Sequence, residues 1–144
     1  KQFRAYDMNE VARYYTASED VAEFLAHYPE RHDFRKEAGG NRVFINVWCW
    51  EPAWKIRVTE NGRELPVRRE QTEDPLYVIS YDIPQSVWKG KYPVDYGKRG
   101  KQHTLFTVNA SGPATTLEIE VTDSFGKVYR ETMTRPKAFG PQMK

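Results

Sequence analysis

The sequence predicts a mainly β protein, an antiparallel β-sandwich preceded by a short helical segment. Apolar and polar residues alternate with a period of two in several runs between residues 43 and 134, as they do in strands with one buried face. Turn signals separate these runs at intervals of about 8–12 residues, a spacing typical of a sandwich. Six or seven strands arranged in this way favour an immunoglobulin-like architecture.

Residues 1–42 form a segment with a mostly helical pattern. Residues 1–6 alternate weakly and predict a short strand. Apolar residues then recur at helical intervals from Met8 and again from Val21, so we expect two short helices. Residues 30–42 are polar and carry two glycines near their end, which predicts a linker loop.

Local signals mark where these helices begin and end. Asp7 with Glu10, and Thr16 with Glu19, have the spacing of a capping box, in which the first side chain accepts a hydrogen bond from the first turn of the helix. Pro29 ends the second helix, because proline has no backbone N–H to donate.

The best-specified strands lie between residues 43 and 67. Asn61-Gly62 separates two alternating runs and predicts a tight hairpin, since both residues tolerate a positive φ. The first strand is expected to present two faces, with Val43, Ile45, Val47 and Cys49 on one and Phe44, Asn46, Trp48 and Trp50 on the other.

The middle of the chain is less regular. Residues 68–75 are highly charged and predict a connection between strands. Tyr77, Ile79 and Tyr81 occupy alternate positions and predict a further strand. The glycines and prolines of residues 84–102 are expected to break any regular element there.

The last third of the chain returns to clear alternation. Residues 104–110, 117–122 and 128–133 predict three strands, separated by turns that contain glycine. Residues 135–144 contain two prolines and are expected to fray.

Composition limits the class of protein. The chain of 144 residues is long enough for one domain, and its formal net charge of +2 is too even to indicate a nucleic-acid or membrane partner. No apolar run approaches the roughly 18 residues of a membrane-spanning helix. Cys49 is the only cysteine, so no intrachain disulfide can form. The sequence begins at Lys1 without a signal peptide, and we read it as a piece of a longer protein or a processed form.

The first candidate site is a basic segment, residues 88–103. Basic residues interleaved with aromatic ones can hold phosphate groups or stack on rings, although aromatic side chains can equally anchor a solvated loop to the sandwich. The candidate ligand or interface residues of this segment are Lys89, Lys91, Lys98, Arg99, Lys101, Trp88, Tyr92 and Tyr96.

The second candidate is the aromatic cluster Trp48, Trp50 and Trp54. An exposed row of aromatic rings on a sandwich can bind sugar rings. A large apolar patch is more often an interface, so we favour cover by the N-terminal helices or by another domain.

Other reactive groups give weaker signals. His27, His32 and Asp33 are the only local cluster of histidine and carboxylate, but the two histidines are five residues apart instead of the four that a helical zinc site needs. We expect a solvated loop there. Cys49 is expected to be a buried structural cysteine, because it falls on the apolar face of a predicted strand.

Four stretches of the sequence resemble one family: QFRAYDMN at residues 2–9, VFINVWCWEPAWKIRVTENG at 43–62, ISYDIP at 79–84 and LEIEVTDSFGKVYRETMTRPKAF at 117–139. The family is the C-terminal domain of calcineurin-like phosphoesterases of Bacteroides-type bacteria. Its most specific parts are the W-x-W-[ED]-P-x-W block and the V-T-D-x-F-G-x-x-Y-x-E block.

The resemblance implies that a small β domain and a metal-dependent phosphoesterase domain precede this one in the parent protein. Two divalent metals are expected in that catalytic domain, where they activate water and hold phosphoryl oxygens. The metal-binding motifs are absent here, and Gly40-Asn41-Arg42 has arginine where the metal-binding histidine would stand. We therefore assign no catalytic residue, no metal ligand and no cofactor to this chain, and do not expect it to be an enzyme by itself.

We expect residues 1–144 to be one accessory domain, with a helical segment and linker (1–42), a sandwich (43–134) and a tail (135–144). Its expected partner is the phosphoesterase domain of the same polypeptide, with the basic segment near the substrate cleft. We expect no nucleic-acid partner and no membrane contact by this domain. The resemblance implies a periplasmic or cell-surface parent. A carbohydrate-binding or interaction module remains the alternative.

Overall fold

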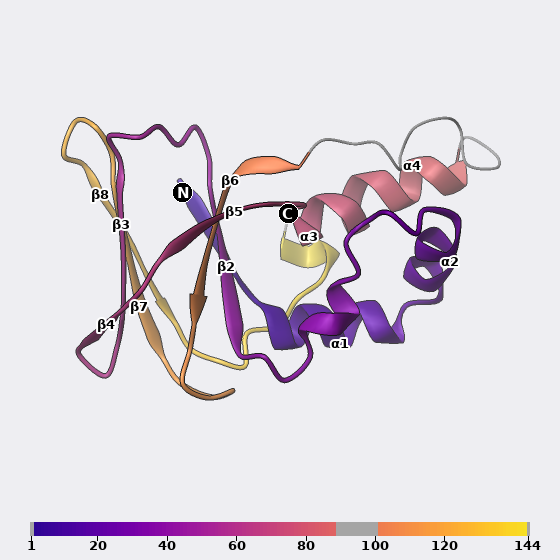
Figure 1. Cartoon of the computed structure of the whole chain (residues 1–144), viewed down its shortest axis with the longest axis horizontal. Helices are drawn as coiled ribbons and strands as arrows, with labels where there is room; N and C mark the ends of the chain where they lie inside the picture. Colours follow the sequence, from indigo (N-terminus) through magenta and orange to yellow (C-terminus); the bar gives the residue numbers. More distant parts are fainter. Residues whose placement is uncertain (1, 89–100, 144) are drawn as a thin grey trace.

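The computed structural model describes residues 2–88 and 101–143, without the side chains of Val87 and Trp88. In these residues eight strands form two antiparallel sheets, and helices pack beside one of them (Figure 1). The first sheet contains, in spatial order, β1 (Phe3–Asp7), β2 (Arg42–Val47), β6 (Gln102–Asn109) and β5 (Arg68–Thr72). The second contains β4 (Arg63–Leu65), β3 (Lys55–Glu60), β7 (Leu117–Thr122) and β8 (Val128–Met133).

The strand order is that of an immunoglobulin-like sandwich. When the strands are lettered in chain order as A, B, C, C′, D, E, F and G, the first sheet reads A-B-E-D and the second reads C′-C-F-G. The fold class predicted from the sequence, an antiparallel sandwich with an N-terminal helical segment, is therefore confirmed.

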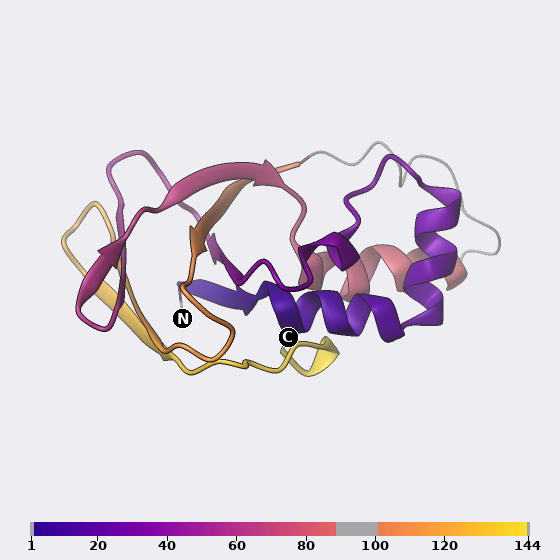
Figure 2. The ribbon, with the colours of Figure 1, turned by 60° about the horizontal axis from the view of Figure 1, so that its bottom comes forward.

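Two helical insertions cover the outer face of the first sheet (Figures 1 and 2). The first, between β1 and β2, contains α1 (Met8–Ala17), α2 (Glu19–His27) and the 3₁₀ turn η1 (Phe34–Glu37). The second, between β5 and β6, contains α3 (Pro75–Tyr77), the π-helical turn η2 (Val78–Asp82) and α4 (Ile83–Trp88). The described part of the molecule therefore has three layers, with the first sheet in the middle.

Two hydrophobic cores follow from this arrangement. Val43, Ile45 and Val47 of β2 face the second sheet, whereas Phe44 faces the helices, and all four are fully buried. Because successive side chains of a strand point to opposite faces, a strand in the middle layer must be apolar on both. The three consecutive apolar residues of β2, Val43, Phe44 and Ile45, reflect this position.

The predicted hairpin at Asn61-Gly62 is present between β3 and β4. Both residues have a positive φ, 50° and 75°, as a two-residue hairpin turn requires. The first helix also begins as predicted, with the Asp7 side chain accepting a hydrogen bond from the Asn9 backbone. The second does not, because Ser18 rather than Thr16 caps α2 by accepting from the Val21 backbone.

The strand predicted at Tyr77, Ile79 and Tyr81 is wrong, because residues 75–88 are helical. Asp74 caps this helical segment and Pro75 occupies its first turn, a combination that starts helices. Leu76, Ile79 and Ile83 recur at helical spacing and are buried, while the two tyrosines lie four residues apart on the exposed side. The expected break throughout residues 84–102 is also wrong for α4.

The charged connection predicted at residues 68–75 is wrong as well, because residues 68–72 form β5. β5 pairs on one side with β6 and has no strand on its other side in the described structure. Charged side chains on such an edge strand prevent pairing with other chains. The charges of Arg68, Arg69 and Glu70 therefore fit an edge strand as well as they fit a loop.

Residues 30–42 are not a solvated linker. Phe34 is fully buried and packs against Tyr15 and Phe44 with ring centroids 5.2 and 6.2 Å apart. Arg31 and Glu37 are also buried, at 7% and 8% exposure. Polar composition was misleading here because buried charges with partners replace part of the apolar core.

The tail does not fray in the described residues, which extend to Met143. Arg135 is buried against Asp7, and Phe139 is buried against Tyr6 and Tyr14 with edge-to-face ring contacts. The last turn, η4 (Pro141–Met143), lies beside the helical layer (Figure 2). The tail is therefore part of the helical core.

The lowered pKa of Glu37 predicts how the stability of the fold depends on pH. His32, whose Nε2 lies 3.6 Å from the carboxylate, and Arg42, which donates to it at 3.0 Å, lower the pKa of Glu37 below its usual 4.5, against the opposing effect of burial. The carboxylate is therefore favoured in the folded state. Its contribution is complete above about pH 4.5 and is lost as the pH falls through the lowered folded pKa.

We expect Glu37→Gln to flatten the fall in unfolding free energy between about pH 5 and 3, as measured by urea denaturation at each pH. Glu64→Gln is the control, since Glu64 is 63% exposed in a surface ion pair with Arg57. An acid profile of Glu37→Gln that runs parallel to the unmodified chain would contradict this assignment.

Candidate functional site

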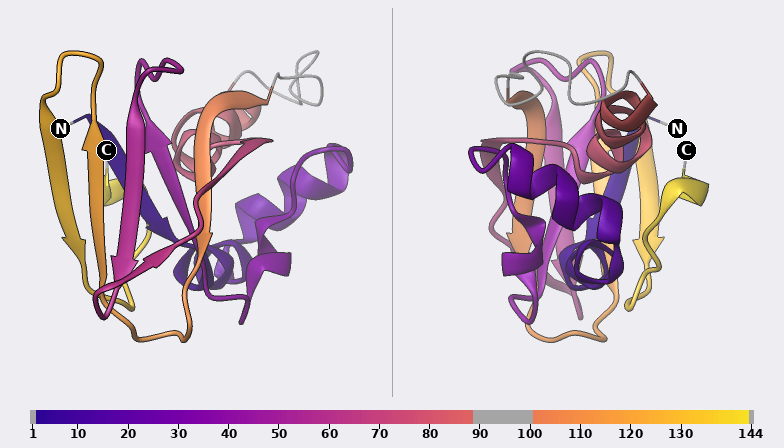
Figure 3. Two further views of the ribbon diagram at one scale, coloured as in Figure 1. Left: turned by 60° about the vertical axis from the view of Figure 1, so that its left-hand side comes forward. Right: turned by 90° about the vertical axis from the view of Figure 1, so that its right-hand side faces the viewer.

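The candidate site lies at one end of the sandwich, where several strand ends meet. Phe3 pairs with Val47, and Lys55 pairs with Thr122, so the start of β1 lies at the same end as the β2–β3 and β7–β8 connections. Figure 3 shows both connections at one end of the sheets, beside the N-terminus. We call this surface the tryptophan end: Gln2, residues 48–54 and residues 123–127.

The first two tryptophans of this end are half-buried and each carries an arginine on its ring. The Arg4 guanidinium lies 5.4 Å from the Trp48 ring centroid. The Arg69 guanidinium lies 4.3 Å from that of Trp50, which also packs edge-to-face on Phe106. Cation–π contacts of this kind hold the rings in place and cover part of their surface.

Trp48 and Cys49 correct the predicted first strand. β2 ends at Val47, and Cys49 has a positive φ of 57° and is exposed, so it is not the buried structural cysteine that the alternation predicted. Trp50 consequently does not share the face of Phe44, whereas Trp48 contacts Arg4, which pairs with Asn46 on that face. The N-terminal helices cover Phe44, whereas Trp50 and Trp54 pack at the edge of the core between the sheets.

Glu51 joins the two connections of the tryptophan end. Its carboxylate accepts hydrogen bonds from Trp54 Nε1 at 3.1 Å and from the Ser124 hydroxyl at 2.6 Å. The β2–β3 connection is thereby tied to the β7–β8 turn. The result is one continuous surface instead of two independent loops.

The β7–β8 turn is held by Asp123. Its side chain accepts hydrogen bonds from the backbone N–H groups of Phe125 and Lys127 at 2.9 and 3.0 Å, and from the Tyr129 hydroxyl at 3.2 Å. Partial loss of hydration raises the pKa of Asp123, but these hydrogen bonds outweigh it and place the pKa below 3.8. The turn is therefore fixed in the charged state of Asp123 at neutral pH.

Phe125 lies at the tip of this turn and is 95% exposed. The other exposed large hydrophobic side chains of the described residues, Tyr77 and Tyr81, are 39% and 43% exposed and stack on each other with centroids 5.0 Å apart. Phe125 was not among the candidate residues. The Asp-Ser-Phe-Gly sequence indicates this exposure, because an apolar residue at the tip of a tight turn cannot reach the core.

The structure tests little of the basic segment. Lys89, Lys91, Tyr92, Tyr96, Lys98 and Arg99 lie outside the described residues, as does the side chain of Trp88. Lys101 is described and exposed, directly before β6. Since Leu105 of β6 pairs with Asn46 of β2, Lys101 lies toward the tryptophan end of the first sheet.

A buried polar network lies between the helical layer and this sheet. Arg31 forms ion pairs with Glu73 and Asp82, the latter at 2.6 Å, and the His32 backbone N–H donates to Glu73 at 2.7 Å. Arg31 also covers the ring of Phe24. These groups fasten the two helical insertions to each other, which is a structural role.

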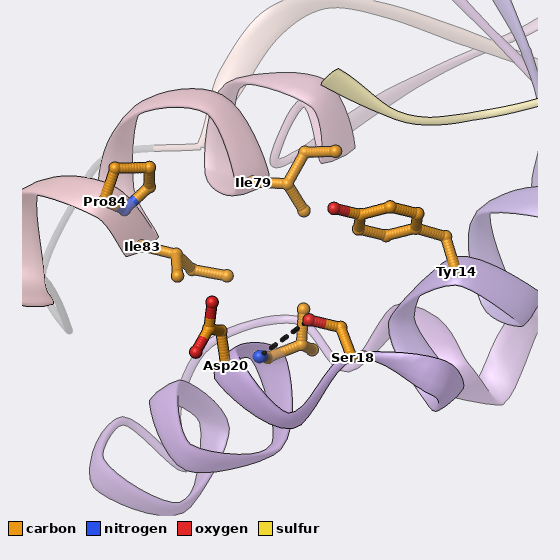
Figure 4. A pocket seen from close by; sticks show the side chains of 7 residues that line it. Tyr14, Ser18, Asp20, Ile79, Ile83 and Pro84 are labelled. Carbon is orange, nitrogen blue, oxygen red and sulfur yellow. Dashed lines mark hydrogen bonds between the residues drawn. The ribbon is translucent and has the colours of Figure 1, made fainter. Parts of the chain in front are cut away.

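The helical layer also contains a cavity of about 260 Å³ between α2 and the second insertion. Its lining is mainly apolar and includes Val21, Ile79, Ile83 and Pro84. In Figure 4 the Tyr14 hydroxyl and the Asp20 carboxylate point into this space. We assign it no ligand, because the described contacts do not select one.

The described residues do not supply a metal site. No group of three or more histidine, cysteine, aspartate or glutamate side chains is placed to hold a metal ion in residues 2–88 and 101–143. In the cluster His27, His32 and Asp33, both Asp33 oxygens accept from Arg35, at 2.8 and 2.9 Å. This pairing lowers the pKa of Asp33.

The fold and the tryptophan end together define a class of protein: an immunoglobulin-like β-sandwich with two helical insertions and one aromatic, cationic end. Residues 2–129 match the family described as the C terminal of calcineurin-like phosphoesterase. The chain belongs to this family. Comparisons with curated proteins and with solved structures found no match. No helix in the described part of the chain is long and apolar enough to cross a membrane.

Proposed function

We propose that this chain is a non-catalytic accessory domain of a metal-dependent phosphoesterase and that its basic segment borders the substrate cleft. The family match carries the proposal, because a C-terminal region of this family is linked to a phosphoesterase domain. In the parent, two divalent metals in that catalytic domain supply the hydrolytic chemistry. This chain packs on the catalytic domain and places positive charge beside its substrate cleft.

The position of Lys101 supports the second part of the proposal. Lys101 and the exposed Arg69 lie toward the same end as Gln2, where the chain enters β1 from the preceding domain. Phosphate substrates are anions, and exposed cations beside a cleft raise the local concentration of anionic substrates. The parent is a periplasmic or cell-surface protein of Bacteroides-type bacteria in this proposal, which rests on the resemblance of the sequence alone.

The test is to change Lys98, Arg99 and Lys101 to alanine in the full-length parent. We expect kcat/KM for anionic phosphate esters to fall by about tenfold at low salt, and the loss to shrink as ionic strength rises. Steady-state kinetics with Mn²⁺ at two salt concentrations measure both effects. The control triple variant changes Arg13, Lys36 and Arg63, exposed cations on other surfaces, to alanine. Kinetics unaltered by the first triple variant would refute the role of the basic segment.

The alternative, a carbohydrate-binding module, is less well supported by the geometry. A sugar ring stacks on an open aromatic face, but Arg4 and Arg69 already lie against the rings of Trp48 and Trp50. Trp54 is half-buried and its ring nitrogen donates to Glu51. This arrangement suits an interface with a protein surface better than a platform for sugars.

A further inference from the structure

We infer that the preceding phosphoesterase domain docks on the tryptophan end and that Phe125 is the central anchor of the contact. This inference rests on the proposed function and specifies which surface of the domain carries it. The partner that binds this surface is the linked domain of the same polypeptide. The alternatives are a second copy of this chain and docking through another face.

The path of the chain supplies the first argument. The Gln2 carbonyl accepts from the Trp48 backbone N–H at 3.1 Å, and Gln2 Nε2 donates to the Trp48 carbonyl at 3.0 Å. The residue that connects β1 to the preceding domain is therefore fastened to the tryptophan end itself. A domain tethered there has an effective concentration near this surface in the millimolar range, according to general estimates for short linkers.

The rigidity of Phe125 supplies the second argument. An exposed phenylalanine on a mobile loop would lose conformational freedom on binding, which opposes association. Phe125 instead lies on a turn that Asp123 holds through two backbone hydrogen bonds and that Ser124 joins to Glu51. The side chain is presented to solvent at 95% exposure on a fixed backbone, as a preorganised anchor is.

The surroundings of Phe125 supply the third argument. Aromatic side chains and exposed Pro52 and Ala53 lie within the tryptophan end, and cationic side chains stand within or beside it. Its two carboxylates, Glu51 and Asp123, already accept hydrogen bonds within this surface. Binding interfaces commonly have an aromatic centre with arginine and a polar rim. The cationic side chains are Arg4, Arg69, Lys101 and Lys127. The docking face of the phosphoesterase domain should accordingly contain an apolar pocket for Phe125 with carboxylates near it.

The rival surface is the pair Tyr77 and Tyr81. These rings are less than half exposed and stack on each other, so each already has an aromatic partner. They belong to the second helical insertion rather than to the loops beside Gln2. They provide an internal comparison for any measurement on the full-length parent.

The experiment is hydroxyl-radical footprinting of the full-length parent, with oxidation of Phe125, Tyr77 and Tyr81 read by mass spectrometry. A phenylalanine that is 95% exposed should be oxidised readily. We expect at least fivefold protection of Phe125 relative to the same chain unfolded in urea, and clearly less protection of the two tyrosines. Repeating the measurement over a hundredfold dilution should leave the protection of Phe125 unaltered.

The matched variants are Phe125→Ser and Tyr81→Ser in the same full-length chain, with circular dichroism to verify folding. We expect Phe125→Ser to increase the radius of gyration in small-angle X-ray scattering and to speed proteolysis between the domains about tenfold. Tyr81→Ser should change neither.

Each result bears on the inference separately from the proposed function. If Phe125 is oxidised as freely as in the unfolded chain, the domains do not dock through the tryptophan end; the inference fails and the accessory role stands. If Phe125 protection disappears on dilution, the occupant is a second copy and the inference fails. The accessory role is tested separately, by the kinetics of the basic-segment variants.

Discussion

Replacing Asp74 with alanine should lower the free energy of unfolding of this chain by about 3–5 kcal/mol. Asp74 is only 7% exposed and accepts four hydrogen bonds. One oxygen accepts from the Tyr6 hydroxyl at 3.1 Å and from Asn46 Nδ2 at 2.5 Å. The other caps the second helical insertion by accepting from the backbone N–H groups of Leu76 and Tyr77.

The loss is expected to be large because all four donors would be left without this acceptor. Burial, and then the charge of Asp74, raise the pKa of Tyr6 well above its ordinary value, so its hydroxyl stays protonated and needs an acceptor. Asp74 also joins β1, β2 and the second insertion through Tyr6, Asn46 and Leu76. Its removal therefore loosens one sheet and one helical segment together.

Asp74→Asn separates charge from geometry. Asparagine keeps one oxygen but turns the other acceptor into a donor, so it cannot satisfy both pairs of donors, and we expect a loss of about 1–3 kcal/mol. The control is Asp20→Asn, at an exposed position in the first turn of α2. Urea denaturation measures all three variants. A loss below about 1 kcal/mol for Asp74→Ala would show that the network does not depend on this carboxylate.

Replacing Arg135 with leucine should cost about 3–5 kcal/mol, because it leaves a buried carboxylate without its cation. The side chains of Arg135 and Asp7 have no exposed surface, and Arg135 Nε lies 3.3 Å from Asp7 Oδ2. Arg135 also donates to the Gly112 carbonyl at 2.7 Å. The pair fastens the tail to the junction of β1 and α1.

A double-mutant cycle tests this explanation. Asp7→Asn removes the buried charge and still caps α1, since asparagine is a good helix cap. We expect the double variant Asp7→Asn/Arg135→Leu to be more stable than Arg135→Leu alone, as measured by urea denaturation. Additive losses in the two single variants would instead indicate that the loss comes from packing and not from the unpaired charge.

The sequence predicted the strands that have one buried face. Leu117, Ile119 and Val121 of β7 alternate with polar residues that face solvent, and this pattern identifies a strand without knowledge of its neighbours. The Asn61-Gly62 hairpin was predictable for a similar reason, since two adjacent residues determine its turn. Local chemistry was sufficient in both cases.

The elements that the sequence did not predict depend on distant partners. In the sequence Arg31 belongs to a polar stretch, and its partners Glu73 and Asp82 lie beside it only because the second insertion packs there. Arg135 likewise depends on Asp7, at the other end of the chain. The strand prediction at Tyr77, Ile79 and Tyr81 is wrong because their alternate spacing resembles a strand, whereas Asp74-Pro75 starts a helix just before them.

The candidate site was predicted in part. Trp48, Trp50 and Trp54 do lie together at one end, but arginines from other strands, rather than the N-terminal helices, lie on the rings of Trp48 and Trp50. Cover by another domain stays a prediction. Arg4 and Arg69 are far from the tryptophans in sequence, so only the sheet register brings them near. Phe125 was not predicted, although the Asp-Ser-Phe-Gly turn indicates an apolar residue at an exposed tip, where the structure places it.

The position of β1 in the chain means that the helical segment cannot be removed without damaging the sandwich. β1 precedes both helices of the first insertion but pairs with β2 as an edge strand of the first sheet. A fragment without the first 42 residues would lose the α1–α2 layer and also uncover the hydrogen-bonding edge of β2. That edge has apolar side chains on both faces and would be a template for intermolecular strand pairing, so the helices and the sandwich form one inseparable unit.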